Sequence, residues 1–190
     1  MLIMKSTSIW ALGVVSALGV AACSSHATSS TSTTVAGVTT TTIGLIEGVQ
    51  TFSGLERTHT TDPVTYPQSP PVGGNHDPVW QNCGVYDAPV QNEHAVHSME
   101  HGAVWLAYNT ALPPAQVAVL AAFAVNQTHV LVSPYDGMTN VVTATAWGVQ
   151  LKLDSVTDPR LAQFVEKYQE GPQTPELGVA CSGGTGAPAS

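Results

Sequence analysis

Residues 93–108 read EHAVHSMEHGAVWLAY and predict a short helix that leads directly into a buried strand. On a helix, His97 and His101 lie one turn apart on the same face. Gly102 is typical of the residue that ends a helix. The run GAVWLAY over residues 102–108 has the length and apolar character of a strand buried in a sheet. The stretch therefore indicates a domain that combines helices with a sheet.

The remaining periodic segments lie on the C-terminal side of this stretch. We expect helices at residues 114–126 and 160–170, and strands at residues 129–134 and 141–153, with the last strand bent at Trp147-Gly148. Elements in this order predict an α+β fold: a single small domain in which a short, mostly antiparallel sheet carries two helices on one face.

The charge balance excludes one class of function. The 190 residues include 5 Lys and Arg against 13 Asp and Glu, which gives a formal net charge of −8. A nucleic-acid binder needs a basic surface to neutralise phosphates. Because this chain has so few basic residues, we expect no nucleic-acid partner.

The N-terminus has the features of an export signal. Residues 9–22 contain no ionisable side chain, and this run is too short to cross a ~30 Å hydrocarbon core comfortably. It ends in VAAC, with Cys23 last, which resembles a bacterial lipoprotein signal. Residues 1–22 are therefore predicted to be a lipoprotein signal peptide, and the lipid on Cys23 to anchor an exported protein to the outer face of the cell membrane. An ordinary signal with a chance cysteine and a single-pass anchor are the alternatives.

Three segments follow the signal. Residues 23–44 are predicted to be the lipidated cysteine and a flexible, disordered tether, because 13 of the 19 residues from 24 to 42 are Ser or Thr and offer little to bury. Residues 45–181 form the predicted domain. Residues 182–190, which begin SGGTG, are expected to be a disordered tail.

Two cysteines remain once Cys23 is assigned to the lipid. An even pair in an exported chain predicts a disulfide, here between Cys83 and Cys181. Two thiolate metal ligands are the alternative interpretation.

Four of the seven histidines fall between residues 76 and 101. His76 lies in PPVGGNHDP, where two prolines and two glycines predict a rigid loop. His97 and His101 can bind one metal ion from a helix. On a strand, Met99 would join them, and its soft sulfur would favour copper(I). The helical interpretation is preferred, and it makes Met99 a core residue. If these histidines bind no metal, the loop around His76 is a hydrogen-bonded turn and the segment with His97 and His101 is a solvated helical face.

The sequence His97-x-x-Glu100-His101 also matches the H-x-x-E-H pattern of inverted zincins, in which two histidines hold zinc and the glutamate is the general base. Such enzymes are much larger and need a downstream carboxylate ligand on a second helix, and Gly102 would end this helix at once. A zinc-dependent hydrolase with Glu100 as its catalytic residue is therefore an alternative hypothesis.

Four motifs occur together: PPVGGNH at residues 70–76, CGVY at 83–86, HSMEHG at 97–102 and AWG at 146–148. Their combination resembles a bacterial exported family of unknown function, domain-of-unknown-function family 3105, over about residues 55–183. The resemblance implies that His76, His97, Glu100 and His101 are the residues to test, and it agrees with a disulfide between the two cysteines. The family label implies no activity.

We therefore expect a lipid-anchored, extracytoplasmic domain that binds copper or zinc through His76, His97 and His101, with Glu100 as a fourth ligand or as a group that orients a ligand. A structural or adaptor lipoprotein, in which the histidines only brace the loops, is a further hypothesis. His59 and His129 stand apart in the sequence and are not expected to be ligands. The membrane, through the lipid, is the one partner that the sequence indicates.

Overall fold

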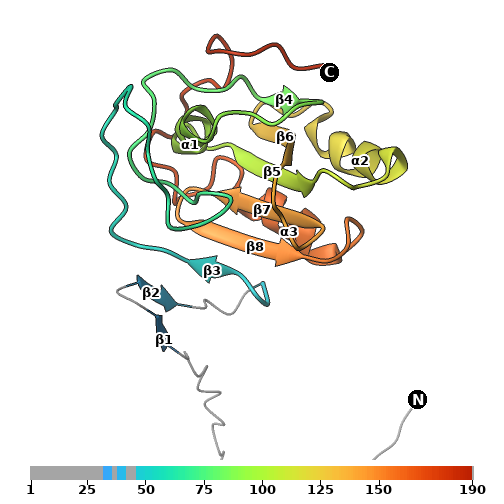
Figure 1. The fold of residues 1–190 in the computed structure, drawn as a ribbon, viewed down its shortest axis with the longest axis horizontal. Helices are drawn as coiled ribbons and strands as arrows, with labels where there is room; N and C mark the ends of the chain where they lie inside the picture. The colour runs from blue at the N-terminus through green and yellow to red at the C-terminus, as the bar shows by residue number, and fades with distance from the viewer. Residues whose placement is uncertain (1–31, 36–37, 42–45, 190) are drawn as a thin grey trace, which may run out of the picture.

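The computed structural model describes residues 32–35, 38–41 and 46–189. Its elements, shown in Figure 1, are β1 (Ser32–Val35), β2 (Val38–Thr41), β3 (Gln50–Thr51), β4 (Gly84–Val85), α1 (Asn92–Glu100), β5 (Val104–Asn109), α2 (Pro114–Ala121), the short 3-10 helix η1 (Ala122–Ala124), β6 (Val130–Tyr135), β7 (Val142–Ala146), β8 (Val149–Leu153) and α3 (Pro159–Tyr168). The predicted signal peptide and Cys23 lie outside the described residues. Among the residues that are described, no helix combines the length and the apolar character needed to span a bilayer.

The strands form one mixed sheet in the order β1-β2-β3-β8-β7-β5-β6-β4. Six of them, β3 to β8, belong to the predicted domain. Both β4 and β5 pair in parallel with β6, and the other pairings are antiparallel. The predicted single α+β domain with a mostly antiparallel sheet is therefore confirmed. Strands β1 and β2 lie within the segment that the sequence assigns to the tether.

Both faces of β5 are covered, which explains why this strand is apolar throughout. Leu106 belongs to one buried cluster with Leu120 of α2 and Phe164 of α3. Trp105, the neighbouring residue on the strand, belongs to a second buried cluster with Met99 of α1. Successive strand residues point to opposite faces, so α2 and α3 cover one face, as predicted, and α1 covers the other. Figure 1 shows α3 behind β7 and β8.

Residues 141–153, predicted to be one bent strand, are instead the antiparallel pair β7 and β8. The two residues between them, Trp147 and Gly148, make a tight turn. Gly148 has a φ of +70°, a conformation that glycine adopts without steric cost, so the chain reverses there instead of bending. The predicted helices also end earlier, α2 at Ala121, where η1 follows, and α3 at Tyr168.

The disulfide predicted between Cys83 and Cys181 is present, with Cα atoms 5.4 Å apart. It fastens the C-terminal segment to the loop before β4. Residues 182–189, which the sequence predicts to be disordered, follow this loop because their backbone finds hydrogen-bond partners there. The Thr185 N–H, for example, donates to the Trp80 carbonyl at 2.8 Å.

Candidate metal centre

Helix α1 carries His97 and Glu100 at its C-terminal end, and a third predicted site residue, His101, is the residue that caps it. The chain turns away from the helix at Gly102, whose φ of +107° suits glycine, and a Cβ at this position would lie 3.1 Å from the Cα atom of Glu170. Met99 is fully buried in the apolar cluster that contains Trp105. Because residues 93–100 are helical, the Met99 sulfur packs in the core and is not a ligand.

The loop before α1 brings two further histidines against the helix. His59 and His76 pair as an isolated parallel β-bridge, in which the Thr60 N–H donates to the His76 carbonyl at 2.8 Å. The two glycines that precede Asn75 both have positive φ, as expected of the rigid loop that the sequence predicts. The loop therefore holds His59 and His76 side by side over α1.

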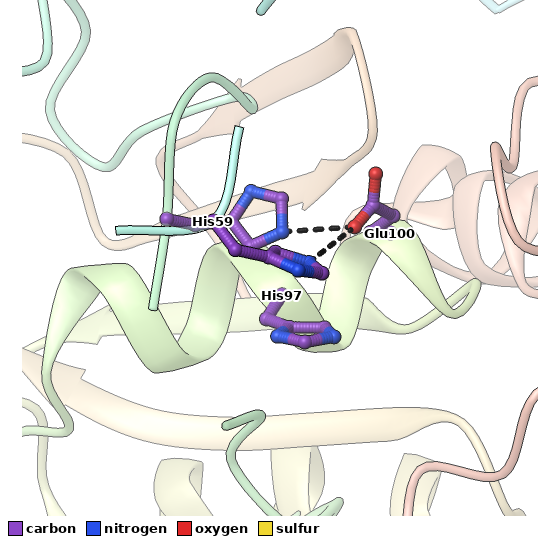
Figure 2. Close-up of side chains that lie close together, drawn as sticks. His59, His97 and Glu100 are labelled. Carbon is purple, nitrogen blue, oxygen red and sulfur yellow. Dashed lines mark ion pairs between the residues drawn. The ribbon is translucent and has the colours of Figure 1, made fainter. Parts of the chain in front are cut away.

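We define the first group as His59, His76, His97 and Glu100, whose ligand atoms all lie within 4.8 Å of one another. The Oε2 atom of Glu100 lies 2.8 Å from His76 Nε2 and 3.5 Å from His59 Nε2. Dashed lines in Figure 2 mark the approach of these rings to the Glu100 carboxylate, and the ring of His97 lies beside that of His59. The two rings stack with their centroids 4.7 Å apart. His76, His97 and Glu100 are buried, and the side chain of His59 is 44% exposed.

We define the second group as His97, His101 and Glu176, which shares His97 with the first. His101 Nε2 lies 3.6 Å from Glu176 Oε2. Glu176 follows α3 in the chain, and its N–H donates to the Glu100 carbonyl at 3.0 Å, so the end of α1 positions it. The two histidines are buried, whereas the Glu176 side chain is 44% exposed.

Backbone carbonyls fix the ring orientation of the three buried histidines. The Nδ1 atoms lie 2.7 Å from Gly74 O for His76, 2.6 Å from Asp77 O for His97 and 2.9 Å from Ala180 O for His101. A carbonyl oxygen only accepts hydrogen bonds, so each Nδ1 carries the proton and donates it. In the neutral ring, Nε2 then holds a lone pair. A backbone carbonyl on the second ring nitrogen is the usual support of a metal-bound histidine.

A buried pair of atoms in the first group has no hydrogen-bond partner. His76 Nε2 and Glu100 Oε2 approach to 2.8 Å, yet neither makes a hydrogen bond. In the neutral His76 tautomer with its proton on Nδ1, this places two lone-pair atoms against each other away from water, which costs free energy unless a proton or another cation lies between them. A cation between them would bond to both. Tetrahedral ligands at about 2.0–2.2 Å from one ion lie about 3.3–3.6 Å apart, so these two atoms, 2.8 Å apart, would separate by about 0.5–0.8 Å to hold it. The residues of the first group therefore fit a metal ion.

Burial also favours the uncharged form of two histidines. It lowers the pKa of His97 to about 4, and neighbouring His101, His76 and His59 lower it further, although the hydrogen bond to Asp77 acts in the opposite direction. Burial likewise lowers the pKa of His101, opposed by the Ala180 hydrogen bond and by the charge of Glu176. Both rings are thus neutral at pH 7, the form in which imidazole binds a metal.

The structure brings together three of the four predicted site residues, His76, His97 and Glu100, and places His101 in the second group. The expectation that one ion touches His76, His97 and His101 is not met in this form, because no group of ligand atoms within 4.8 Å among the described residues contains both His76 and His101.

Two residues of these groups, His59 and Glu176, were not predicted from the sequence. Nothing in its spacing pointed to His59, which reaches the site through a β-bridge. Glu176 is a downstream carboxylate, but it lies in a turn after α3 and not on a second helix as the H-x-x-E-H pattern requires.

A family model described as "Protein of unknown function (DUF3105)" matches residues 58–183. The chain belongs to this family. The match spans every residue of both groups, so the DUF3105 domain includes the whole candidate metal centre. No curated protein and no solved structure matches the chain.

Proposed function

We propose that the DUF3105 domain of this protein binds a single transition-metal ion, copper or zinc, through His59, His76, His97 and Glu100. The observation that carries this proposal is the buried approach of His76 Nε2 to Glu100 Oε2, 2.8 Å without a hydrogen bond. A cation between these two atoms would bond to both, and the fixed tautomers of His76 and His97 leave their Nε2 atoms free to bond it.

The donor set supports zinc or copper over other metals. Imidazole suits both ions, and a carboxylate can complete a four-ligand zinc site. The apolar packing of Met99 removes one argument for copper(I), since its thioether is not part of the set. A cluster built of nitrogen donors with one carboxylate would bind magnesium or calcium poorly, because those ions prefer oxygen ligands.

Export and membrane attachment are the second half of the proposal. The signal-like residues 1–22 and the VAAC sequence that ends at Cys23 support a lipoprotein held at the outer face of the cell membrane. The disulfide between Cys83 and Cys181 is in keeping with this location, because such bonds persist in oxidising compartments. Palmitate labelling of the wild type and of Cys23→Ser tests the anchor, and equal labelling of the two would contradict it.

Metal analysis of the full chain, purified in detergent and incubated with zinc or copper(II), tests the binding. We expect one tightly bound ion per chain, and loss of that tight binding in Glu100→Ala and in His76→Ala. The matched control is His94→Gln, a histidine of the same helix that belongs to neither group. A wild-type protein that binds no ion and melts at the same temperature with and without chelator would instead support a structural role for the histidines.

Zinc-dependent hydrolysis is a second candidate function, favoured by Glu176. Two histidines and a downstream glutamate are a known ligand set of catalytic zinc, and the half-exposed Glu176 leaves room for a water or substrate ligand. Glu100 would be the general base in this scheme, but its carboxylate lies against His76 and His59. Assay of the zinc-loaded protein on peptide and ester substrates distinguishes the two functions. A hydrolase should turn over substrate and lose this activity in Glu100→Gln, whereas a metal-binding protein should show no turnover in either form.

A further inference from the structure

We infer that the two groups are alternative positions of one ion, and that the ion moves between them while it stays bound to His97. This inference rests on the proposed function and extends it from metal binding to metal transfer. It assigns a role to His101 and Glu176, which the first group does not use.

The shared histidine makes the two positions mutually exclusive. Nδ1 of His97 is occupied by the Asp77 carbonyl at 2.6 Å, so only Nε2 can bond a metal. One imidazole nitrogen has one lone pair and serves one ion. A second ion therefore cannot complete the second group while the first group is filled, although each group on its own has at least three ligands.

The ligands on either side of His97 are close enough for a stepwise exchange. The centroid of the His97 ring lies 4.9 Å from that of His76 and 4.6 Å from that of His101. An ion that keeps its bond to His97 can release His76 and Glu100 on one side and take up His101 and Glu176 on the other. Each group supplies one carboxylate, so the charge around the ion is the same before and after the exchange.

Exposure and ligand number give the two positions different tasks. The first group has four ligands, of which three are buried, and is the tighter position. The second has three protein ligands and a half-exposed carboxylate, which leaves a coordination site open to a donor from solution. The partner that fits this position is a metal acceptor with nitrogen, sulfur or carboxylate donors, either a small chelating ligand or a metal-binding site on another protein. It would take the ion from Glu176.

Release kinetics of cobalt(II), which replaces zinc and absorbs visible light, test the inference on the full chain in detergent. The wild type should bind one ion. Glu176→Gln changes a half-exposed side chain, so the fold should survive. The variant should keep one ion with the same spectrum and release it to excess EDTA at least about tenfold more slowly, because even loss of a group that only supports a ligand commonly changes metal affinity or activity about 10–100-fold. His101→Gln should act in the same direction, and His94→Gln should release cobalt at the wild-type rate.

The opposite substitution checks the other position. His76→Ala removes a ligand of the first group and should leave one cobalt ion bound more weakly, with an absorption spectrum that reports fewer nitrogen ligands and with faster release to EDTA. Binding of two ions at once by the wild type would overturn the inference but leave metal binding by the first group intact. Wild-type release rates in both Glu176→Gln and His101→Gln would likewise overturn the inference alone. Absence of any bound cobalt, zinc or copper would overturn the proposed function itself.

Discussion

The two faces of the sheet are built from different kinds of residue. Helix α3 turns only Leu161, Phe164, Val165 and the largely apolar Tyr168 toward the sheet. Helix α1 buries six consecutive residues, and three of these, His97, Ser98 and Glu100, are polar. Burial of polar groups stabilises less than burial of apolar groups and costs free energy where a partner is missing. The comparison indicates that apolar packing on the α3 face stabilises the fold, whereas the α1 face is less stabilising because it buries the polar side chains of the candidate metal centre.

The largest effect is expected on the α3 face. Phe164 is fully buried, so Phe164→Ala should lower the free energy of unfolding by about 3–5 kcal/mol through lost transfer energy and a cavity. Urea unfolding followed by circular dichroism measures the change. Because the substituted ring lies across the sheet from α1, the amount of zinc bound at low temperature should not change. Loss of metal from a variant that is still folded would show that the two faces are coupled.

Removal of the disulfide should come next in size. Cys83→Ser with Cys181→Ser should cost about 2–5 kcal/mol in the free energy of unfolding, because the bond closes a loop with a sequence separation of 98. Ala180, whose carbonyl orients His101, is adjacent to this bond. We therefore expect a variant that resembles His101→Gln in metal release. Unchanged stability under oxidising conditions would contradict the prediction.

Metal removal tests the α1 face alone. A ligand that binds only the folded state stabilises it by about 2.7 kcal/mol at a free concentration one hundred times its Kd. Zinc at that level should raise the free energy of unfolding by this amount in the wild type and equally in Phe164→Ala. Calorimetry with and without EDTA provides the measurement. A shift of the same size in Glu100→Ala would show that zinc binds elsewhere.

Glu100→Gln should separate stability from binding. In the metal-free protein, the glutamine amide can donate a hydrogen bond to His76 Nε2 and removes a buried negative charge. We expect the metal-free variant to be more stable than the wild type by about 1 kcal/mol, the usual net value of a hydrogen bond. Zinc binding should fall in the same variant. A metal-free Glu100→Gln that is less stable than the wild type would mean that the carboxylate braces the loop.

The smallest effect concerns the N-terminal end of α3. The Asp158 carboxylate accepts hydrogen bonds from the backbone and the side chain of Arg160, which lowers the pKa of Asp158 to about 2. A lowered folded-state pKa stabilises the protein above the unfolded value near 4, and this stabilisation is lost as the pH falls through 2. Asp158→Asn should therefore melt below the wild type at neutral pH, and the two melting temperatures should converge toward pH 2. The metal centre should be unaffected.

Local sequence patterns were enough to predict much of the fold, whereas the features that depend on long-range contacts were not predictable. The apolar run at residues 102–108, the glycine that ends α1 and the even pair of cysteines were enough to predict the α+β class and the disulfide. The hairpin at Trp147-Gly148 was missed because a turn and a bend leave the same pattern in an alternating strand. The C-terminal segment was predicted as disordered because its composition gives no sign of the backbone hydrogen bonds to Trp80 that hold it.

The candidate site was only partly predictable for the same reason. His97 and Glu100 share one helix, and the rigid loop around His76 was visible in its prolines and glycines. His59 carries no such signal, since it reaches the site through a pairing with His76 that no short motif records. The division of the ligands into two groups depends on distances between side chains that only the folded chain brings together. The ring orientations depend on backbone partners such as the Asp77 carbonyl, which side-chain types do not reveal.

The backbone partners of the histidines have a consequence for the order of folding. Those of His76 and His97 lie 2 and 20 residues away in the chain, whereas the Ala180 carbonyl lies 79 residues from His101. Short loops close at lower entropic cost than long ones, so we expect the first group to assemble early and the second to mature last. In oxidative refolding, cobalt absorption should thus develop before the cysteine thiols disappear; thiol loss that precedes it would reverse the order.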